Sequence, residues 1–436
     1  MVETSELRAR FARALSAMYG HEVPAYTTLV QVTSEVNADF AAAHPARAER
    51  WGSLARVSAE RHGAVRLGTP AEMYEAAQLF AGFGMHPVGF YDLRDAASPV
   101  PVVSTAFRPI DPAELSRNPF RVFTSLLAVA DRRFFDIDLA ARLDRFLAAR
   151  SLFAPELLAL ATRAERDGGL PEPAATEFVD RATAVFALTD APVDRAWYRE
   201  LEAVSPVAAD IGGVAGTHVN HLTPRVLDID ELYRRMTDRG IAMIDRIQGP
   251  PRWSGPAVLL RQTSFRALAE PRRFLEPDGT IAEGTLRVRF GEVEARGVAL
   301  TPAGRALYDR LDGADASIWE REFPADEEDL DRQGLAYFTY RQGTDGRVVR
   351  EPIVYEDFLP ASAAGIFRSN LDADTVRVHP QTATSGGYDV DRLAGFLGRP
   401  IHDPFDLYRR QQQSSRRTAS PGPPARKDPP SERTPS

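Results

Sequence analysis

Residues 60–80 read ERHGAVRLGTPAEMYEAAQLF, and residues 218–236 read HVNHLTPRVLDIDELYRRM. In both stretches a histidine, His62 or His221, is followed four residues later by an arginine and 12 residues later by a tyrosine. A Thr-x-Phe-Arg sequence then begins 43 residues after His62 and 42 residues after His221. Three landmarks at matched offsets indicate an internal duplication.

Each copy has the pattern of a β-α-β-β unit. A short strand begins near the histidine, and a Thr-Pro or Asp-Ile-Asp sequence is suited to cap the amphipathic helix that follows. A glycine, Gly84 or Gly240, ends that helix before further strands begin. We therefore predict an α+β fold with a duplicated βαβββ core and added helices.

The rest of the chain divides around these two copies. The predicted order is an N-terminal helical segment (1–55), the first module (56–131), a helical insertion (132–207), the second module (208–300), a C-terminal completion of the core and cavity (301–408) and a tail (409–436). The tail contains six prolines and has no apolar cluster, so we expect it to be disordered.

Composition excludes several kinds of chemistry. The 436 residues include no cysteine, so disulfides, iron–sulfur clusters and thiolate zinc sites are absent, and any metal must be held by His, Asp or Glu. The only lysine is Lys427, in the tail, which excludes a Schiff-base lysine and a phosphate-binding loop of the Walker type. The net charge of −8 argues against a nucleic-acid partner. No stretch has the apolar length of a signal peptide or membrane span, so we expect a cytoplasmic protein.

The paired histidines suggest a metal centre. Two equivalent histidines face each other if the copies close around a pseudo-twofold axis, and two histidines with one carboxylate leave positions open at non-haem iron. The stretch GTLRVRFGEVEARGVAL (284–300) supplies Glu292 or Glu294 on a predicted strand. Both acids lie on one face of that strand, so strand parity does not choose between them.

The alternation of side chains along a strand also predicts which neighbouring residues share a face with the histidines. Arg66 lies four residues after His62 and shares its face, and a buried arginine there favours a substrate that carries a carboxylate. His218 lies three residues before His221 and points away in a regular strand. Arg225, which follows Pro224, is either a surface charge or a gate residue.

Long motifs along the chain resemble those of one known family. They are ERHGAVRLGTP, GMHPVGFYDL, VVSTAFRP, HVNHLTPRVLDID, LLRQTSFRA, RFGEVEARGVALTPAGRALYDRL and VYEDFLPASAAGIF, between about Arg56 and Leu371. The chain is similar here to the 2-oxoadipate dioxygenase/decarboxylase family, which includes D-2-hydroxyglutarate synthases. The resemblance implies a vicinal-oxygen-chelate type fold, mononuclear Fe(II), and conversion of 2-oxoadipate and O2 to D-2-hydroxyglutarate and CO2 in lysine catabolism.

The resemblance also assigns roles to residues. It implies that His62, His221 and Glu292 bind the iron, with Glu294 as the alternative acid, and that Arg66 binds a substrate carboxylate. It places Ala361 and Ser362 in contact with the substrate. The expected partners are a small 2-oxo dicarboxylic acid, which serves as its own co-substrate, and O2.

Two functions of other classes fit the same pattern. A glyoxalase-like isomerase or lyase uses the same duplicated unit to hold Zn²⁺ or Ni²⁺ and to abstract a proton from a small 2-oxo acid. A non-catalytic binding module would keep the fold for ligand capture. Dependence on O2 separates the oxygenase from the isomerase, and the presence of both histidines, the acid and the arginine disfavours the binding module.

Overall fold

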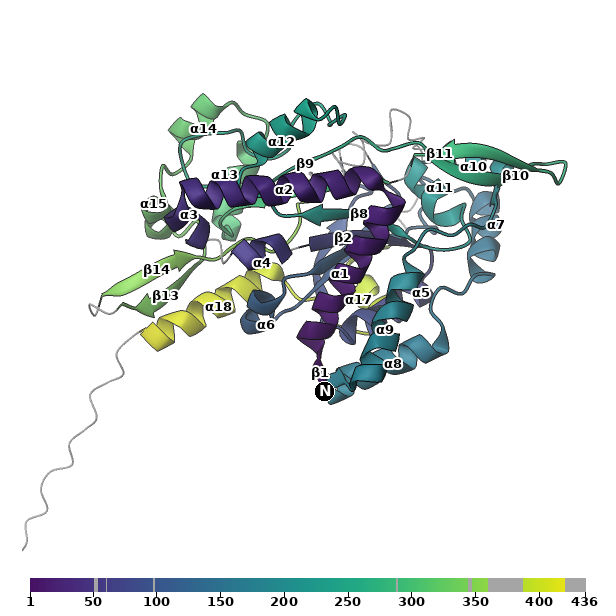
Figure 1. Ribbon diagram of the computed structural model, residues 1–436, viewed down its shortest axis with the longest axis horizontal. Helices are drawn as coiled ribbons and strands as arrows, with labels where there is room; N and C mark the ends of the chain where they lie inside the picture. Colours follow the sequence, from purple (N-terminus) through teal and green to yellow (C-terminus); the bar gives the residue numbers. More distant parts are fainter. Residues whose placement is uncertain are drawn as a thin grey trace, which may run out of the picture.

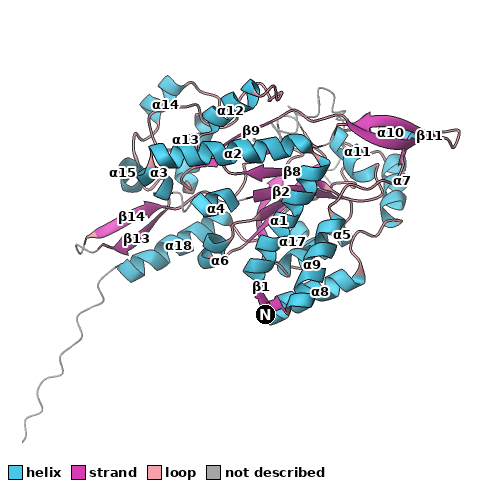
Figure 2. Ribbon diagram, viewed as in Figure 1, coloured by secondary structure: helices cyan, strands magenta, loops and turns pink. Residues whose placement is uncertain are grey.

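The computed structural model of the chain describes residues 1–50, 54–59, 61–96, 99–287, 289–343, 347–359 and 387–419. Helices surround a central group of strands, and two β-hairpins project from it in different directions (Figures 1 and 2). This arrangement confirms the predicted α+β class.

The first repeat folds as the sequence predicts. Its elements are β2 (Arg61–Leu67), α5 (Pro70–Ala81), β3 (His86–Asp92), β4 (Val102–Arg108), the short helix α6 (Pro112–Arg117) and β5 (Arg121–Leu127). Thr69 and Glu72 form a capping box at the start of α5, which satisfies two backbone N–H groups of its first turn. Gly84 follows the helix with φ of 67°, a conformation that favours glycine.

The second repeat has the same order. It contains β8 (Val219–Pro224), α12 (Ile229–Asp238), β9 (Leu260–Ser264) and β12 (Glu292–Arg296). The Asp228 side chain caps α12 by accepting a hydrogen bond from the backbone of Glu231. Between α12 and β9, the bridges Met243–Phe265 and Gln248–Gln262 replace a full strand. A hairpin, β10 (Glu270–Leu275) and β11 (Ile281–Leu286), is inserted before β12. The duplicated core is therefore present.

The two repeats meet edge to edge. One sheet has the order β3-β4-β5-β2-β8, and a bridge between Arg225 and Glu294 links β8 to β12, which pairs with β9. In the antiparallel β2–β8 pair, His62 lies opposite Thr223 and Ala64 lies opposite His221. Because equivalent residues are exchanged across this pair, a pseudo-twofold axis passes through it with one histidine on each side.

The N-terminal helices pack across this junction. They are α1 (Thr4–Glu22), α2 (Pro24–Ala43), α3 (Pro45–Arg50) and α4 (Leu54–Ala59). α1 passes across β2 and β8, and α2 runs alongside β8 (Figure 1). The Tyr19 hydroxyl donates hydrogen bonds to the carbonyls of Asn220 and Phe290, and the Asn37 amide donates to the carbonyl of Arg225. These bonds hold the helices onto β8 and the start of β12.

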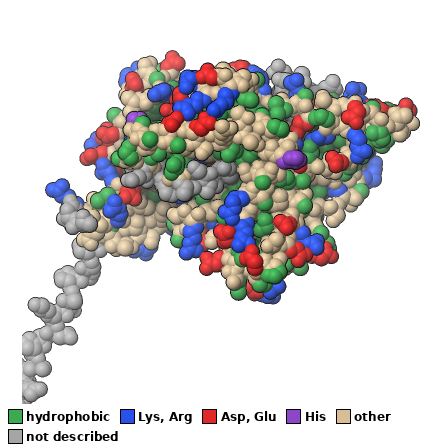
Figure 3. Space-filling model, viewed as in Figure 1, with side chains coloured by type: hydrophobic (Ala, Val, Ile, Leu, Met, Phe, Trp, Pro, Cys, Tyr) green, Lys and Arg blue, Asp and Glu red, His purple; other side chains and the backbone are tan. Residues whose placement is uncertain are grey.

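Ion pairs join α2 to α12 on the surface. Arg235 pairs with Asp39 at 2.8 Å, and Arg239 pairs with Glu35 at 2.7 Å. Figure 3 shows basic and acidic side chains intermingled over this part of the surface. Exposed pairs of this kind stabilise a protein by only about 0–1 kcal/mol each, so the buried packing of α2 contributes more.

The segment between the two repeats is helical. It contains α7 (Ile137–Ala148), α8 (Pro155–Asp167), α9 (Glu172–Val185), α10 (Arg195–Glu202) and α11 (Pro206–Gly212). Two very short strands lie among these helices. β6 (Gly169–Leu170) pairs with β1 (Val2–Glu3), and β7 (Val193–Asp194) pairs with β10.

The C-terminal part forms a second apolar cluster beside the core, around Trp319 and Phe338. The elements of the C-terminal part are α13 (Pro302–Arg310), α14 (Ala316–Glu322), α15 (Glu327–Arg332), β13 (Phe338–Gln342), β14 (Val348–Pro352), α17 (Val390–Leu397) and α18 (Pro404–Ala419). Of these, α17 packs on α5 in the main core and not in the second cluster. No helix within the described residues is long and apolar enough to cross a membrane.

The prediction of disorder from residue 409 is wrong for residues 409–419, which belong to α18. This helix lies along β13, where the side chains of Gln412 and Ser415 accept hydrogen bonds from the backbone of Phe338 and Tyr340. The contact satisfies an otherwise unpaired strand edge, and composition does not reveal such a partner. The rest of the predicted tail, 420–436, lies outside the described residues.

Candidate metal centre

Three predicted site residues meet at the junction of the repeats. His62, His221 and Glu292 are buried, and one ligand atom from each lies within 4.8 Å of the other two. The Nε2 atoms of His62 and His221 are 3.6 and 3.5 Å from the two oxygens of Glu292. Both imidazoles therefore face the same carboxylate.

Neighbouring side chains hold these groups in place. The Gln262 amide on β9 donates a hydrogen bond of 3.0 Å to Glu292. The ring of Phe290 stacks on His221 with centroids 5.0 Å apart. Sequence reasoning missed both, although Phe290 stands two residues before Glu292 and Gln262 directly precedes the threonine landmark of the second repeat.

Glu294 lies on the far side of His62. Its carboxylate is 3.2 Å from His62 Nδ1, and Arg296 donates to it through two nitrogens at 2.5 and 3.0 Å. Nη1 of Arg121 is 3.7 Å away. Glu292 and Glu294 share a strand face, as parity requires, but only Glu292 belongs to the three-residue group that could hold a metal.

Burial shifts the pKa of each of the three residues towards its uncharged form. Burial lowers the pKa of His62, and burial together with His62 lowers the pKa of His221 well below its usual value. Burial, reinforced by Glu294, raises the pKa of Glu292 well above its usual value. Burial alone would also raise the pKa of Glu294, but Arg296 and His62 hold it well below its usual range.

This donor set fits a divalent cation. Neutral imidazoles offer free nitrogen lone pairs, and His62 has its second nitrogen beside a carboxylate, the arrangement that orients metal-bound histidines. A cation would also offset the cost of ionising Glu292 inside the protein. Two imidazoles and one carboxylate form the ligand set both of catalytic zinc sites and of non-haem Fe(II) oxygenases.

Arg66 belongs to a buried polar cluster near His221. It pairs with Asp210 of α11, whose carboxylate also lies 3.3 Å from His218 Nε2 and accepts a 2.8 Å hydrogen bond from Asn220. Asp210 is thus a buried anionic partner of Arg66 within the protein. Sequence reasoning missed Asp210 because it comes from the helical segment that precedes the second repeat.

The prediction that His218 points away is wrong. Ala64 pairs with His221 but Val65 pairs with Val219, so Asn220 is an extra residue in a β-bulge. One inserted residue reverses the alternation of side chains along the strand. His218 therefore reaches Asp210 and the Arg66 cluster.

Arg225 is not a surface charge. It is 1% exposed and forms the bridge between β8 and Glu294 of β12. The other predicted substrate contacts, Ala361 and Ser362, lie outside the described residues.

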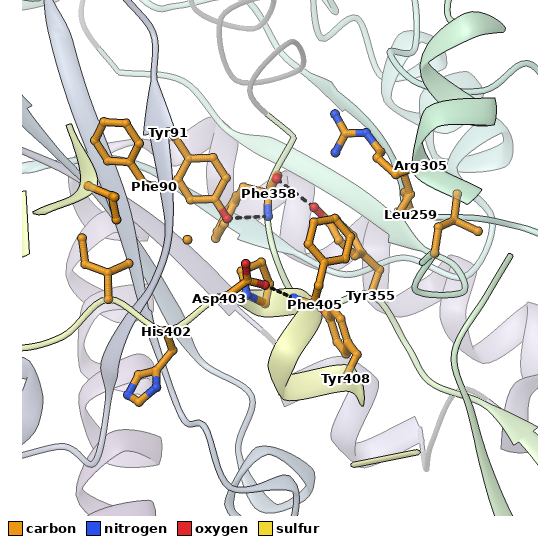
Figure 4. A pocket seen from close by; sticks show the side chains of 15 residues that line it. Phe90, Tyr91, Leu259, Arg305, Tyr355, Phe358, His402, Asp403, Phe405 and Tyr408 are labelled. Carbon is orange, nitrogen blue, oxygen red and sulfur yellow. Dashed lines mark hydrogen bonds between the residues drawn. The ribbon is translucent and has the colours of Figure 1, made fainter. Parts of the chain in front are cut away.

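The segment Tyr355–Leu359 closes one side of the site. The Phe358 ring lies 4.8 Å from the His62 ring, and Tyr91 and Tyr355 bond to its backbone (Figure 4). Beyond it lies a separate cavity of about 370 Å³, lined by Phe358, Tyr91, Tyr355 and Arg305 among others. Phe358 thus stands between this cavity and His62.

Buried ion pairs fix this segment immediately before Phe358. Glu356 pairs with Arg121, and Asp357 accepts hydrogen bonds from Arg108 Nε and Nη2 at 2.7 and 3.1 Å. Arg296 donates to the carbonyls of Tyr355 and Asp357. The segment is thereby tied to both repeats.

Comparison with known proteins identifies the family. A family model described as 2-oxoadipate dioxygenase/decarboxylase matches residues 11–370. A Mycobacterium tuberculosis protein of that name is 62% identical over 421 residues, covering 95% of this chain and 99% of the relative. An Escherichia coli protein of the same name is 42% identical over 452 residues, covering 95% and 98%.

A solved structure has the same fold. The hydroxyglutarate synthase from Pseudomonas putida in complex with 2-oxoadipate superposes with a TM-score of 0.80 and 37% identity, covering 96% of this chain and 98% of that one. Similarity at this level over nearly the whole length extends to the repeats and to the helices around them. The chain therefore belongs to the 2-oxoadipate dioxygenase/decarboxylase family.

Proposed function

We propose that this protein is an Fe(II)-dependent dioxygenase and decarboxylase. It converts 2-oxoadipate and O2 to D-2-hydroxyglutarate and CO2 in lysine catabolism, with the 2-oxo acid as its own co-substrate. The observation that carries the proposal is the buried group of His62, His221 and Glu292 in a chain of this family. The complex of the Pseudomonas putida relative with 2-oxoadipate supports the choice of substrate.

In this proposal His62, His221 and Glu292 hold Fe(II), which supplies the redox chemistry that activates O2 when bound. Glu294, whose carboxylate lies 3.2 Å from Nδ1 of His62, keeps the imidazole proton on that nitrogen and so presents the lone pair of Nε2 to the ion. The Phe358 and Phe290 rings cover His62 and His221 and exclude water beside them.

Arg66 orients the substrate in the same proposal. Its guanidinium is held by Asp210, which fixes it before a ligand enters, and its planar fork suits a second carboxylate. With one carboxylate of 2-oxoadipate bound by Arg66, the reacting end of the acid is fixed relative to the metal group. Ala361 and Ser362 are proposed to contact the substrate from the segment that follows Phe358.

Oxygen consumption tests the proposed function. Protein loaded anaerobically with Fe(II) and then exposed to air and 2-oxoadipate should consume one O2 and release one CO2 per 2-hydroxyglutarate formed. No 2-oxoglutarate should be needed. Turnover without O2 would instead indicate the isomerase or lyase alternative, and a requirement for 2-oxoglutarate would exclude self-oxidation.

Substituting Arg66 with lysine is expected to raise the KM for 2-oxoadipate by about tenfold, because one directional contact replaces a bidentate one. Steady-state O2 consumption measures the change. The matched ligand is 2-oxohexanoate, which has the same chain length without the second carboxylate, and its KM should change much less. An equal change for both acids would contradict a role for Arg66 in carboxylate binding.

Substituting Glu294 with glutamine is expected to weaken Fe(II) or Zn²⁺ binding by about 10–100-fold, because the residue that orients His62 loses its charge. Metal titration of the apoprotein measures this loss. Glu292→Gln provides the comparison, since it removes a proposed ligand and should bind metal more weakly still. If Glu294→Gln were the more damaging change, the two acids would have the reverse roles.

A further inference from the structure

The internal symmetry identifies the first-repeat counterpart of Glu292. In the parallel pair β2–β5, Arg66 lies opposite Ser125, and in β8–β12 the equivalent Arg225 is bridged to Glu294. Ser125 therefore corresponds to Glu294. Two residues earlier on each strand, Phe123 corresponds to Glu292.

The pairing of β5 with β4 and of β12 with β9 gives the same correspondence between Phe123 and Glu292. In β4–β5 the landmark threonine of the first repeat, Thr105, lies opposite Thr124, and in β9–β12 its equivalent, Thr263, lies opposite Val293. The preceding residue is again Phe123 in the first repeat and Glu292 in the second. The two registers are independent because they use different neighbouring strands.

The surroundings of Phe123 agree with this position. Phe123 is 3% exposed, and it shares a strand face with Arg121, whose Nη1 lies 3.7 Å from Glu294 of the second repeat. Its ring centroid is 5.1 Å from that of Phe358, which contacts His62. The Phe123 side chain therefore faces the junction of the repeats, next to the candidate metal centre.

The pseudo-twofold axis exchanges His62 with His221 and so leaves the histidine pair unchanged. It also exchanges the positions of Glu292 and Phe123. The backbone at Phe123 is thus placed to present a fourth protein ligand to the same ion. Its benzyl side chain has no donor atom.

We propose that Phe123 limits this centre to three protein ligands and so keeps a coordination position open for the 2-oxo acid or O2. The inference rests on the proposed function, because it presumes a metal at the histidine pair. An oxygenase that binds a chelating acid and O2 together needs more open positions than four protein ligands would leave. Phe123 therefore affects the coordination of the metal because its side chain supplies no ligand atom.

Substituting Phe123 with glutamate tests the proposal. We expect the variant to bind Co²⁺ or Zn²⁺ at least about tenfold more tightly than the wild type, because even outer contacts change metal affinity by 10–100-fold. The Co²⁺ absorption spectrum should change because a carboxylate is added. Under nitrogen, the metal-loaded variant should bind 2-oxoadipate at least about tenfold more weakly, because the acid loses a position at the ion.

Phe123→Leu is the matched control, since it also removes the ring but adds no donor. Its metal affinity and Co²⁺ spectrum should stay close to those of the wild type. Phe123→His is a second donor variant, closer in size to phenylalanine, should the glutamate variant not fold without metal. Circular dichroism of each metal-free variant checks its fold.

Unchanged metal affinity and Co²⁺ spectra in the folded donor variants would overturn the inference. So would equal tightening in Phe123→Leu, which would indicate an effect of packing. A wild-type protein that binds no Fe(II), Co²⁺ or Zn²⁺ would instead overturn the proposed function and this inference with it. The two failures are thus distinguished by the wild-type titration alone.

Discussion

Substituting His62 with alanine is expected to remove metal binding and turnover together. His62 Nε2 faces Glu292 at the centre of the candidate site, and it is 2% exposed, so water has little access to take its place. Removing a proposed ligand should weaken metal binding by more than about 100-fold. Substituting a residue that only hydrogen-bonds to a ligand already weakens metal binding by about 10–100-fold. Metal content after anaerobic dialysis and O2 consumption with 2-oxoadipate measure the two losses.

His221→Ala should have the same effect, because the pseudo-twofold axis makes the two histidines equivalent. The control is His21→Ala, which removes an exposed histidine of α1 and should leave both metal content and turnover unchanged. A His62→Ala protein that keeps its metal would contradict the proposed ligand set. Loss of turnover with full metal retention would indicate that His62 binds the substrate and not the metal.

Most of the features that could be predicted from the sequence follow from the internal repeat. Matched offsets after His62 and His221 place both residues at the same position of equivalent strands. Such a pair must meet if the copies associate through those strands, and the register of β2 with β8 brings them together. The repeat did not choose between Glu292 and Glu294, which share a strand face, and the choice of Glu292 rested on the family resemblance.

Other features depend on contacts that the sequence does not encode locally. Alternation along β8 fails at Asn220, because one inserted residue changes which way His218 points. Asp210 reaches Arg66 from a helix that shows no sequence relation to either repeat. Residues 409–419 form a helix because an edge strand lies beside them, not because their composition favours burial.

Glu356 and Asp357 are a further case. The two adjacent acids of VYEDFL are both buried, since Glu356 is 3% exposed and Asp357 is 1% exposed. Each meets an arginine from a distant strand of the first repeat, Arg121 or Arg108. The pairing is visible only once the chain has folded, and it places Phe358 against His62.

Substituting Asp357 with alanine is expected to lower the free energy of unfolding by about 3–5 kcal/mol, because Arg108 is left as a buried charge without its carboxylate. The Tyr408 hydroxyl also loses its acceptor, since it bonds to the same carboxylate. Urea denaturation of the metal-free protein measures the change. Glu200→Ala is the matched control, because Glu200 pairs with Arg142 on the surface and should change stability by only about 0–1 kcal/mol.

The double variant Arg108→Met with Asp357→Leu separates the lost charge from lost packing. Replacing both members of a buried pair with apolar side chains is often neutral or stabilising, so this protein should recover much of the loss. It should still differ from the wild type in turnover, because Asp357 fixes the backbone on one side of Phe358, which covers His62. Equal costs for Asp357→Ala and Glu200→Ala would show that the buried pair does not hold this segment.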